Sequence, residues 1–259
     1  MTLPLDEARI QAILLDIEGA TTSIDFVYQT LFPYARRHLL EFVERHYGSN
    51  DFRNTVDQLR REWEADARQS DDCPAWKSES RAAEIESIVA YCYWLMDQDR
   101  KSTPLKSLQG MIWESGYRNG DLRGHVYPDV PAAFARWKQQ GKTISIFSSG
   151  SVLAQKLIFA HTEAGDLTPF ITAYFDTTTG PKRGAESYRK IAVALGAPSN
   201  EILFLSDSVA ELDAAQSAGM QTALSVRPEN PPTGPISHRM IRSFDEVFGS
   251  ALPFTPMGT

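Results

Sequence analysis

An apolar run that ends in two carboxylates lies near the start of this chain. Residues 12–15 read A-I-L-L, and Asp16, Ile17, Glu18 and Gly19 follow directly. Such a short aliphatic run is typical of a strand that is buried on both faces of a parallel sheet. Residues two apart in extended chain point the same way, so Asp16 and Glu18 are predicted to project together beyond the sheet. Because open α/β folds bind ligands at the carboxyl edge of their strands, the run predicts an active-site strand.

The second half of the chain alternates between strand and helix patterns. Each short apolar run is followed by a turn and then by residues at helical spacing, which indicates βα units and a Rossmann-like parallel sheet. A helix is predicted over residues 131–140, a proline-rich loop over 228–235, and only a short tail element over 241–248. The predicted strands are residues 12–15, 143–147, 171–175, 201–205 and 222–226.

The segment between the first strand and this βα region has a helical pattern. Its apolar residues recur at helical spacing in three successive runs. Pro33 is predicted to kink or break the first run, and Thr103 followed by Pro104 predicts the start of a further helix. We therefore predict an α/β core formed by residues 1–19 and 124–259, with an all-helical cap, residues 20–123, inserted after the first strand.

The charge and composition exclude several classes of partner. The chain has a formal net charge of −7, and no stripe of Lys and Arg accompanies an aromatic platform. Nucleic acid and anionic membranes are therefore not expected as partners. The sequence has neither a basic N-terminal start nor a long apolar segment, so we expect no signal peptide and no membrane span. The 2 cysteines and 5 histidines lack metal-ligand spacing. The scarcity of cysteine fits a reducing cytoplasm, and we expect the protein to be a monomer.

Polar side chains follow three of the predicted strands at the same edge of the sheet. A lysine in the loop T-T-G-P-K-R-G precedes a long helix and is placed to reach the same side. The groups supply a nucleophilic carboxylate, a proton-transfer carboxylate, hydroxyl donors, a cation and a further carboxylate, which together predict phosphoryl transfer. They are Asp16 with Glu18, Ser148 with Ser149, Asp207, and Lys182.

Each of these groups also has a purely structural interpretation. Ser148, Ser149 and Gly150 would serve as a cap for the helix that follows them, and Asp207 would do the same for its own helix. Lys182 would be an ordinary solvated loop lysine. The shared position at strand ends and neighbouring loops favours the chemical interpretation, because phosphoryl transfer requires these groups together.

Four motifs in this order resemble those of the haloacid dehalogenase-like superfamily. They are L-L-D-I-E-G around Asp16, I-F-S-S-G around Ser148, Lys182 itself, and L-F-L-S-D-S-V-A-E around Asp207. More closely, D-I-E-G, the S-S-G-S-V segment, E-S-Y-R-K-I-A and D-R-K-S-T-P-L-K-S-L-Q-G resemble the enolase-phosphatase (acireductone synthase) family of methionine salvage. Glu18, where most of the superfamily has aspartate, points to this narrower family.

One position departs from the family pattern. Enolase-phosphatases have D-I-E-G-T, whereas this chain has Ala20 in place of the threonine. The change removes a hydroxyl and a methyl group that would steady the loop. Thr21 and Thr22 are the residues expected to compensate for it.

The resemblance implies a catalytic role for each strand-end residue. Asp16 would attack phosphorus and become an aspartyl phosphate. Glu18 would protonate the leaving enol oxygen and then deprotonate the hydrolytic water. Ser148 and Ser149 would donate hydrogen bonds to the phosphoryl oxygens, whose charge Lys182 would offset.

The resemblance also implies one Mg²⁺ per chain. Its protein ligands would be the carboxylates of Asp16 and Asp207 and the main-chain carbonyl of Glu18, a set of oxygen ligands that suits magnesium. Glu211 would lie outside this set and orient either Lys182 or a metal-bound water.

The implied reaction has two steps. A phosphorylated small molecule, 2,3-diketo-5-methylthiopentyl-1-phosphate, would be converted to its enol phosphate and then to acireductone and phosphate. The cap would exclude water and hold the methylthio tail in an apolar pocket.

Four alternatives stay open: another capped phosphatase, a dehalogenase, a phosphoacceptor receiver module, and a binding protein without turnover. The position of Asp16 on the first strand argues against the receiver module, and the residues leave the enolisation base unassigned.

Overall fold

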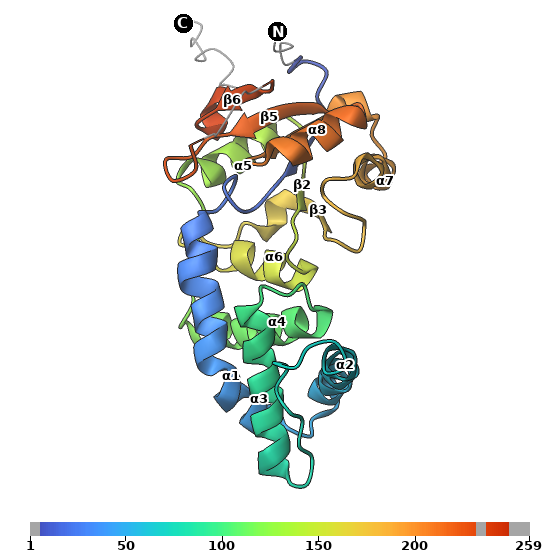
Figure 1. The fold of residues 1–259 in the computed structure, drawn as a ribbon. Helices are drawn as coiled ribbons and strands as arrows, with labels where there is room; N and C mark the ends of the chain where they lie inside the picture. The colour runs from blue at the N-terminus through green and yellow to red at the C-terminus, as the bar shows by residue number, and fades with distance from the viewer. Residues whose placement is uncertain (1–5, 232–236, 249–259) are drawn as a thin grey trace, which may run out of the picture. The chain divides into compact units, whose positions relative to one another are not determined.

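A six-stranded parallel sheet forms the centre of the α/β part of the protein (Figure 1). The computed structural model describes residues 6–231 and 237–248. All neighbouring strands pair in parallel, in the order β3-β2-β1-β4-β5-β6. The parallel α/β fold predicted from the sequence is therefore confirmed. The strands are β1 (Ala12–Leu15), β2 (Thr143–Phe147), β3 (Ile171–Phe175), β4 (Ile202–Ser206), β5 (Gln221–Ser225) and β6 (Arg239–Ile241).

The first strand lies at the point where the strand order reverses. β1 pairs with β2 on one side and with β4 on the other, and Leu15 lies opposite Ile146 and Leu205. All four residues of β1 are buried, as its aliphatic sequence predicts. The carboxyl ends of β1, β2 and β4 therefore meet where open α/β sheets form their binding crevice.

Helices of the α/β part pack against this sheet. Tyr188 and Ile191 of α7 and Leu212 of α8 share a buried cluster with Ala12 and Leu14 of β1. Burial of these apolar side chains stabilises the sheet at roughly 25 cal/mol per Å². The helices are α5 (Asp129–Gln139), α6 (Val152–Ala160), α7 (Ala185–Leu195) and α8 (Val209–Ser217).

The described chain divides into two compact units. The first contains the sheet and runs up to Phe26 and again from Arg123, and the second, Val27–Leu122, is entirely helical. Within the second unit α1 contacts α3 and α4, and α2 contacts the same two helices. A short π-helix, Phe26–Leu31, leads directly into the first of its α-helices. These helices are α1 (Phe32–His46), α2 (Asn50–Asp66), α3 (Arg81–Asp97) and α4 (Thr103–Asn119).

Local sequence explains where these helices begin and end. Pro33 lies in the first turn of α1, directly after the π-helix, and Leu31 at the junction has helical backbone angles. At the predicted kink or break the chain therefore changes from π-helix to α-helix without leaving the helical conformation. The Ser102 hydroxyl accepts a hydrogen bond from the Leu105 N–H at the start of α4, and Gly120 ends that helix in the left-handed conformation. No helix in the described part of the chain is both long and apolar enough to cross a membrane.

Two sequence predictions need correction. α5 begins at Asp129, two residues before the predicted start, because proline at position 131 still lies in the first turn, where no N–H is needed. The predicted tail element, 241–248, contains a 3₁₀ turn, Phe244–Glu246, but only the last residue of the strand β6, which begins at Arg239. Both elements are too short to give a periodic pattern. Of the predicted loop 228–235, residues 228–231 are irregular, and the rest lie outside the described residues.

Candidate active site

Asp16 lies at the carboxyl end of β1 and is held by three donors. Its side chain is almost fully buried. The Ile17 N–H donates to Oδ1 over 2.8 Å, and the Lys182 ammonium lies 2.7 Å from the same oxygen. The Ser206 hydroxyl donates to the other oxygen, Oδ2, over 2.9 Å. Because a carboxylate can accept at both oxygens, these donors hold Asp16 in one orientation.

Lys182 is a buried cation between two carboxylates. Its ammonium lies 2.7 Å from Asp16 Oδ1 and 2.7 Å from Glu211 Oε2, and the side chain is only 8% exposed. Burial lowers the pKa of Lys182, but the charges of Asp16 and Glu211 outweigh that effect and raise it above its ordinary value. The Tyr188 hydroxyl fixes the loop by donating to the Lys182 carbonyl over 2.7 Å. The interpretation of Lys182 as a solvated loop lysine is therefore wrong.

Glu211 lies on the first turn of α8 and contacts Lys182. Lys182 is one of the two groups, with a metal-bound water, that Glu211 was predicted to orient. Its carboxylate also accepts from the Ser206 hydroxyl over 3.2 Å. Burial and then the charge of Asp16 raise the pKa of Glu211, whereas Lys182 opposes the rise. The structure thus gives Glu211 a position from which it orients the lysine.

Asp207 follows β4 at the same edge. Its Oδ2 accepts from the Asn230 side-chain amide over 3.1 Å. Burial raises the pKa of Asp207, and the negative charge of Asp16 adds to the rise. The N-cap of α8 is Ser208, so the interpretation of Asp207 as a helix cap is wrong.

Ser148 and Ser149 follow β2, the strand beside β1. Ser148 is buried, and its hydroxyl accepts from the Gly150 N–H over 3.1 Å. Ser149 is exposed. The cap of α6 is Ser151, whose hydroxyl accepts from the Ala154 N–H, so the capping role considered for Ser148 and Ser149 belongs to a later residue.

The loop after Asp16 turns tightly around one carbonyl. The extended chain ends at Leu15, and the Ile17 carbonyl accepts from the N–H groups of Ala20, Thr21 and Thr22 over 3.3, 3.0 and 2.8 Å. The Thr21 hydroxyl lies 3.2 Å from the Asp16 and Ile17 carbonyls, and the Thr22 hydroxyl donates to the His125 carbonyl. These bonds hold the loop in which the chain has Ala20 in place of threonine. Glu18, within this loop, is partly exposed.

Replacing Gly19 by alanine should disrupt this loop. Gly19 has φ +68°, and an added Cβ would lie 2.3 Å from Asp207 Oδ2 and 2.5 Å from the Asn230 amide nitrogen. We expect Gly19→Ala to lower kcat/KM by about tenfold or more, because the displaced carboxylate misaligns the site.

The matched control for Gly19→Ala is Gly196→Ala at the end of α7. Gly196 has φ +65°, but nothing lies within 4 Å of its added Cβ. Both variants share the backbone strain, so steady-state kinetics and thermal melts separate strain from the clash. Equal activity in the two variants would contradict the clash argument.

The excess of negative charge in the site fits a divalent cation. The carboxyl groups of Asp16, Asp207 and Glu211 face one ammonium, and the charge of Asp16 opposes ionisation of the other two. Carboxylate and carbonyl oxygens are the ligands that Mg²⁺ prefers. Among the described residues no cluster of three or more His, Cys, Asp or Glu side chains is placed to bind a metal. The predicted set has two carboxylates and takes its third protein ligand from the main chain.

Two residues of the site were not predicted from the sequence. Ser206 lies beside Asp16 because Leu15 pairs with Leu205, so that the next residues of the two segments are neighbours. Asn230 lies in the loop after β5 and reaches Asp207. The available signal for Asn230 was the end of the last predicted strand, residues 222–226, because the polar loop after it leaves the sheet at the same edge.

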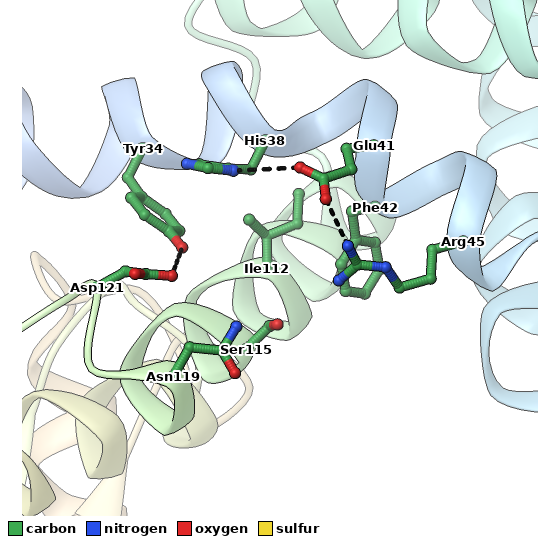
Figure 2. Close-up of a pocket in the computed structure, with 9 residues that line it drawn as sticks. All are labelled: Tyr34, His38, Glu41, Phe42, Arg45, Ile112, Ser115, Asn119 and Asp121. Carbon is green, nitrogen blue, oxygen red and sulfur yellow. Dashed lines mark hydrogen bonds and ion pairs between the residues drawn. The ribbon is translucent and has the colours of Figure 1, made fainter.

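A pocket in the helical unit lies apart from these residues in sequence. It is lined by α1, α4 and Asp121, and five of its polar side chains pair with one another, as Figure 2 shows. The Tyr34 hydroxyl donates to Asp121, and Glu41 pairs with His38 and Arg45. Because polar side chains predominate in its lining and only Phe42 and Ile112 are aliphatic or phenyl groups, the pocket does not match the apolar one expected for a methylthio tail.

A family model and several curated proteins match the chain. The model of the haloacid dehalogenase-like hydrolases matches residues 10–219. Enolase-phosphatase E1 of Synechococcus elongatus is 48% identical over 247 residues, which cover 95% of this chain and 100% of the relative. Enolase-phosphatase E1 of Pseudomonas aeruginosa is 50% identical over 214 residues, or 82% of this chain and 88% of the relative.

Solved structures resemble the fold. The crystal structure of the UTR4 protein from Saccharomyces cerevisiae has a TM-score of 0.74 and 32% sequence identity, covering 91% of this chain and 99% of that one. CbbY from Rhodobacter sphaeroides in complex with phosphate has a TM-score of 0.53 at 16% identity, covering 93% of this chain and 97% of that one, which shows a shared fold alone.

Proposed function

The chain belongs to the haloacid dehalogenase-like hydrolases and, within them, to the enolase-phosphatases, and from this premise we propose how its residues perform the reaction. The protein is a phosphatase of the acireductone synthase type, which acts in methionine salvage. The substrate that follows is the phosphorylated diketone 2,3-diketo-5-methylthiopentyl-1-phosphate. The observation that supports a phosphoryl-transfer mechanism is the buried Asp16 carboxylate, which is aligned by Lys182 and Ser206.

Asp16 is the proposed nucleophile. One carboxylate oxygen attacks phosphorus and forms the aspartyl phosphate, while the bond between phosphorus and the enol oxygen breaks. Glu18, two residues later in a loop fixed by backbone hydrogen bonds, gives its proton to that oxygen. In the second half-reaction Glu18 takes a proton from water, whose oxygen attacks phosphorus and releases Asp16 and phosphate.

The remaining polar residues stabilise charge in this proposal. Lys182 offsets the charge of the phosphoryl oxygens and is oriented by Glu211. Ser148 and Ser149 donate hydrogen bonds to the same oxygens from the end of β2. We also propose that the helical unit is the substrate cap and that the enzyme works as a cytoplasmic monomer.

Asp16, Asp207 and the Glu18 carbonyl are the proposed ligands of one Mg²⁺. When bound, the ion supplies positive charge that neutralises the phosphate and offsets the repulsion between the two carboxylates. The donor chemistry supports this, because hard oxygen donors suit magnesium and softer metals favour nitrogen or sulfur ligands.

The proposal is tested with 2,3-diketohexyl 1-phosphate, an analogue of the diketone, by following enol absorbance and phosphate release together. We expect both signals with Mg²⁺, and loss of phosphate release when a chelator removes the ion, because charge neutralisation is then lost. Re-addition of Mg²⁺ should restore the rate, which is the control for damage by the chelator.

The same assay separates the alternatives. Release of phosphate from general phosphomonoesters but not from the diketone would favour another capped phosphatase. Turnover that survives complete chelation would contradict the magnesium mechanism, and absence of any turnover would favour a receiver or binding protein.

A further inference from the structure

The loop after β5 is hydrogen-bonded to the loop that follows Asp16. Arg227 is almost fully buried, and its Nε and Nη2 donate to the Ala20 carbonyl over 3.1 and 2.8 Å. Its Nη1 contacts both carboxylate oxygens of Asp129, over 3.0 and 2.9 Å. A planar guanidinium can make these two sets of contacts at once because its donors form a rigid fork.

Aromatic rings and backbone groups fix this arginine further. Its guanidinium carbon lies 4.1 Å from the ring centre of Tyr127 and 4.8 Å from that of Phe244. The Asp129 carboxylate also accepts from the Phe244 N–H over 2.6 Å. Arg227 is therefore a rigid anchor for the Ala20 carbonyl, because its cation is paired with Asp129, stacked on two rings and hydrogen-bonded from each of its three nitrogens.

Asn230 extends this anchor to the fourth motif. Its Oδ1 accepts from the Arg227 N–H over 2.7 Å, and its Nδ2 donates to Asp207 Oδ2 over 3.1 Å. The same Nδ2 lies 3.4 Å from the Gly19 carbonyl. One amide thus touches the loop after β1 and the carboxylate after β4, two segments almost two hundred residues apart in sequence.

We propose that Arg227 and Asn230 form a clamp that sets the position of the Asp207 carboxylate relative to the Glu18 loop, and so positions the magnesium ligands. The inference rests on the proposed magnesium-dependent function. Neither residue touches the reacting atoms in this account, and both are positioning residues. Asn230 holds Asp207 directly, and Arg227 holds the backbone one residue after Gly19.

The Asp207 carboxylate lies close to both Gly19 and Asp16, and it therefore needs a fixed orientation. Asp207 Oδ2 and the Asn230 amide both occupy space that any Cβ on residue 19 would fill. The buried Asp16 carboxylate and the partly buried Asp207 carboxylate repel each other. Without the Asn230 amide, less would hold Asp207 against rotation away from Asp16. A hydrogen bond from a neutral amide holds the carboxylate without neutralising the charge that attracts the cation.

The test is Mg²⁺ binding by the intact protein without substrate, measured by isothermal titration calorimetry. We expect Asn230→Ala to weaken the affinity by about tenfold or more, as loss of a partner of a metal ligand typically does. In the diketohexyl phosphate assay its activity should be recovered by raised Mg²⁺, with KM for the diketone unchanged. The matched control is Asn200→Ala, an exposed asparagine in the turn before β4, at the opposite end of the strand from Asp207.

Arg227→Lys is the second variant and serves if Asn230→Ala fails to melt cooperatively. Lysine keeps the charge beside Asp129 but lacks the fork that reaches the Ala20 carbonyl, so the same loss of Mg²⁺ affinity is expected. Wild-type affinity in a folded Asn230→Ala protein would overturn the clamp and leave the proposed function intact. Absence of Mg²⁺ binding by the wild type would instead overturn the proposed cation site, and the clamp with it.

Discussion

Asp16→Asn should abolish phosphate release from the diketone phosphate, with kcat falling by about 10⁴-fold or more, because the amide cannot form the acyl phosphate. The substitution keeps the size of the side chain, and the fold is expected to remain. Phosphate release and enol absorbance measured in one assay would show which of the two steps is lost. Quenched reactions of the wild type should show phosphorus attached to protein, and those of Asp16→Asn should not.

The matched control for this variant is Asp166→Asn. Asp166 is an exposed aspartate before β3, and its carboxylate accepts from the Thr168 N–H over 2.8 Å. It should retain wild-type kcat. If Asp16→Asn released phosphate at a rate close to that of the wild type, the nucleophile would have to be assigned to another group.

Lys182→Ala should lower both activity and stability. Activity is expected to fall by about 10² to 10³, because the phosphoryl charge loses its fixed partner. Removal of the ammonium also leaves the buried Asp16 and Glu211 carboxylates facing each other, which should lower the free energy of unfolding by about 3–5 kcal/mol. Steady-state kinetics and urea denaturation at neutral pH measure the two effects separately.

A double variant distinguishes these two consequences of losing Lys182. Adding Glu211→Gln to Lys182→Ala removes one of the unpaired carboxylates, so stability should partly recover while activity stays low. The control is Lys190→Ala on α7, whose exposed ammonium contacts only the Thr179 carbonyl over 3.5 Å among the bonds described. No recovery of stability in the double variant would contradict the charge argument.

Much of the fold was predictable because the local spacing of apolar residues indicates where strands and helices form. The aliphatic run at residues 12–15 is a buried central strand, and helical spacing with a Ser102 cap and Gly120 terminus defines α4. Strand ends could be placed at one edge because parallel strands share a direction. That rule was enough to predict that Asp16, Asp207 and the Lys182 loop lie in one region.

Short or irregular segments could not be predicted from local periodicity. β6 has three residues and follows a loop rich in proline, so it carries too few positions for an alternating pattern to show. The first turn of α5 holds a proline, which made its start appear later than it is. Boundaries depend on hydrogen bonds at element ends, and these are only weakly encoded in residue type.

The sequence by itself determined which chemical groups this protein has and at which strand ends and loops they lie. Asp16 and Asp207 follow apolar strand runs, and Lys182 lies in a loop before a long helix. Only the tertiary structure decided which group touches which. That Ser206 supports Asp16, that Glu211 orients Lys182, and that Asn230 holds Asp207 all depend on strand order and register. The physical reason is that local pattern reflects the backbone and solvent around each residue. Contacts between loops far apart in the chain arise from the packing of the whole sheet and its helices.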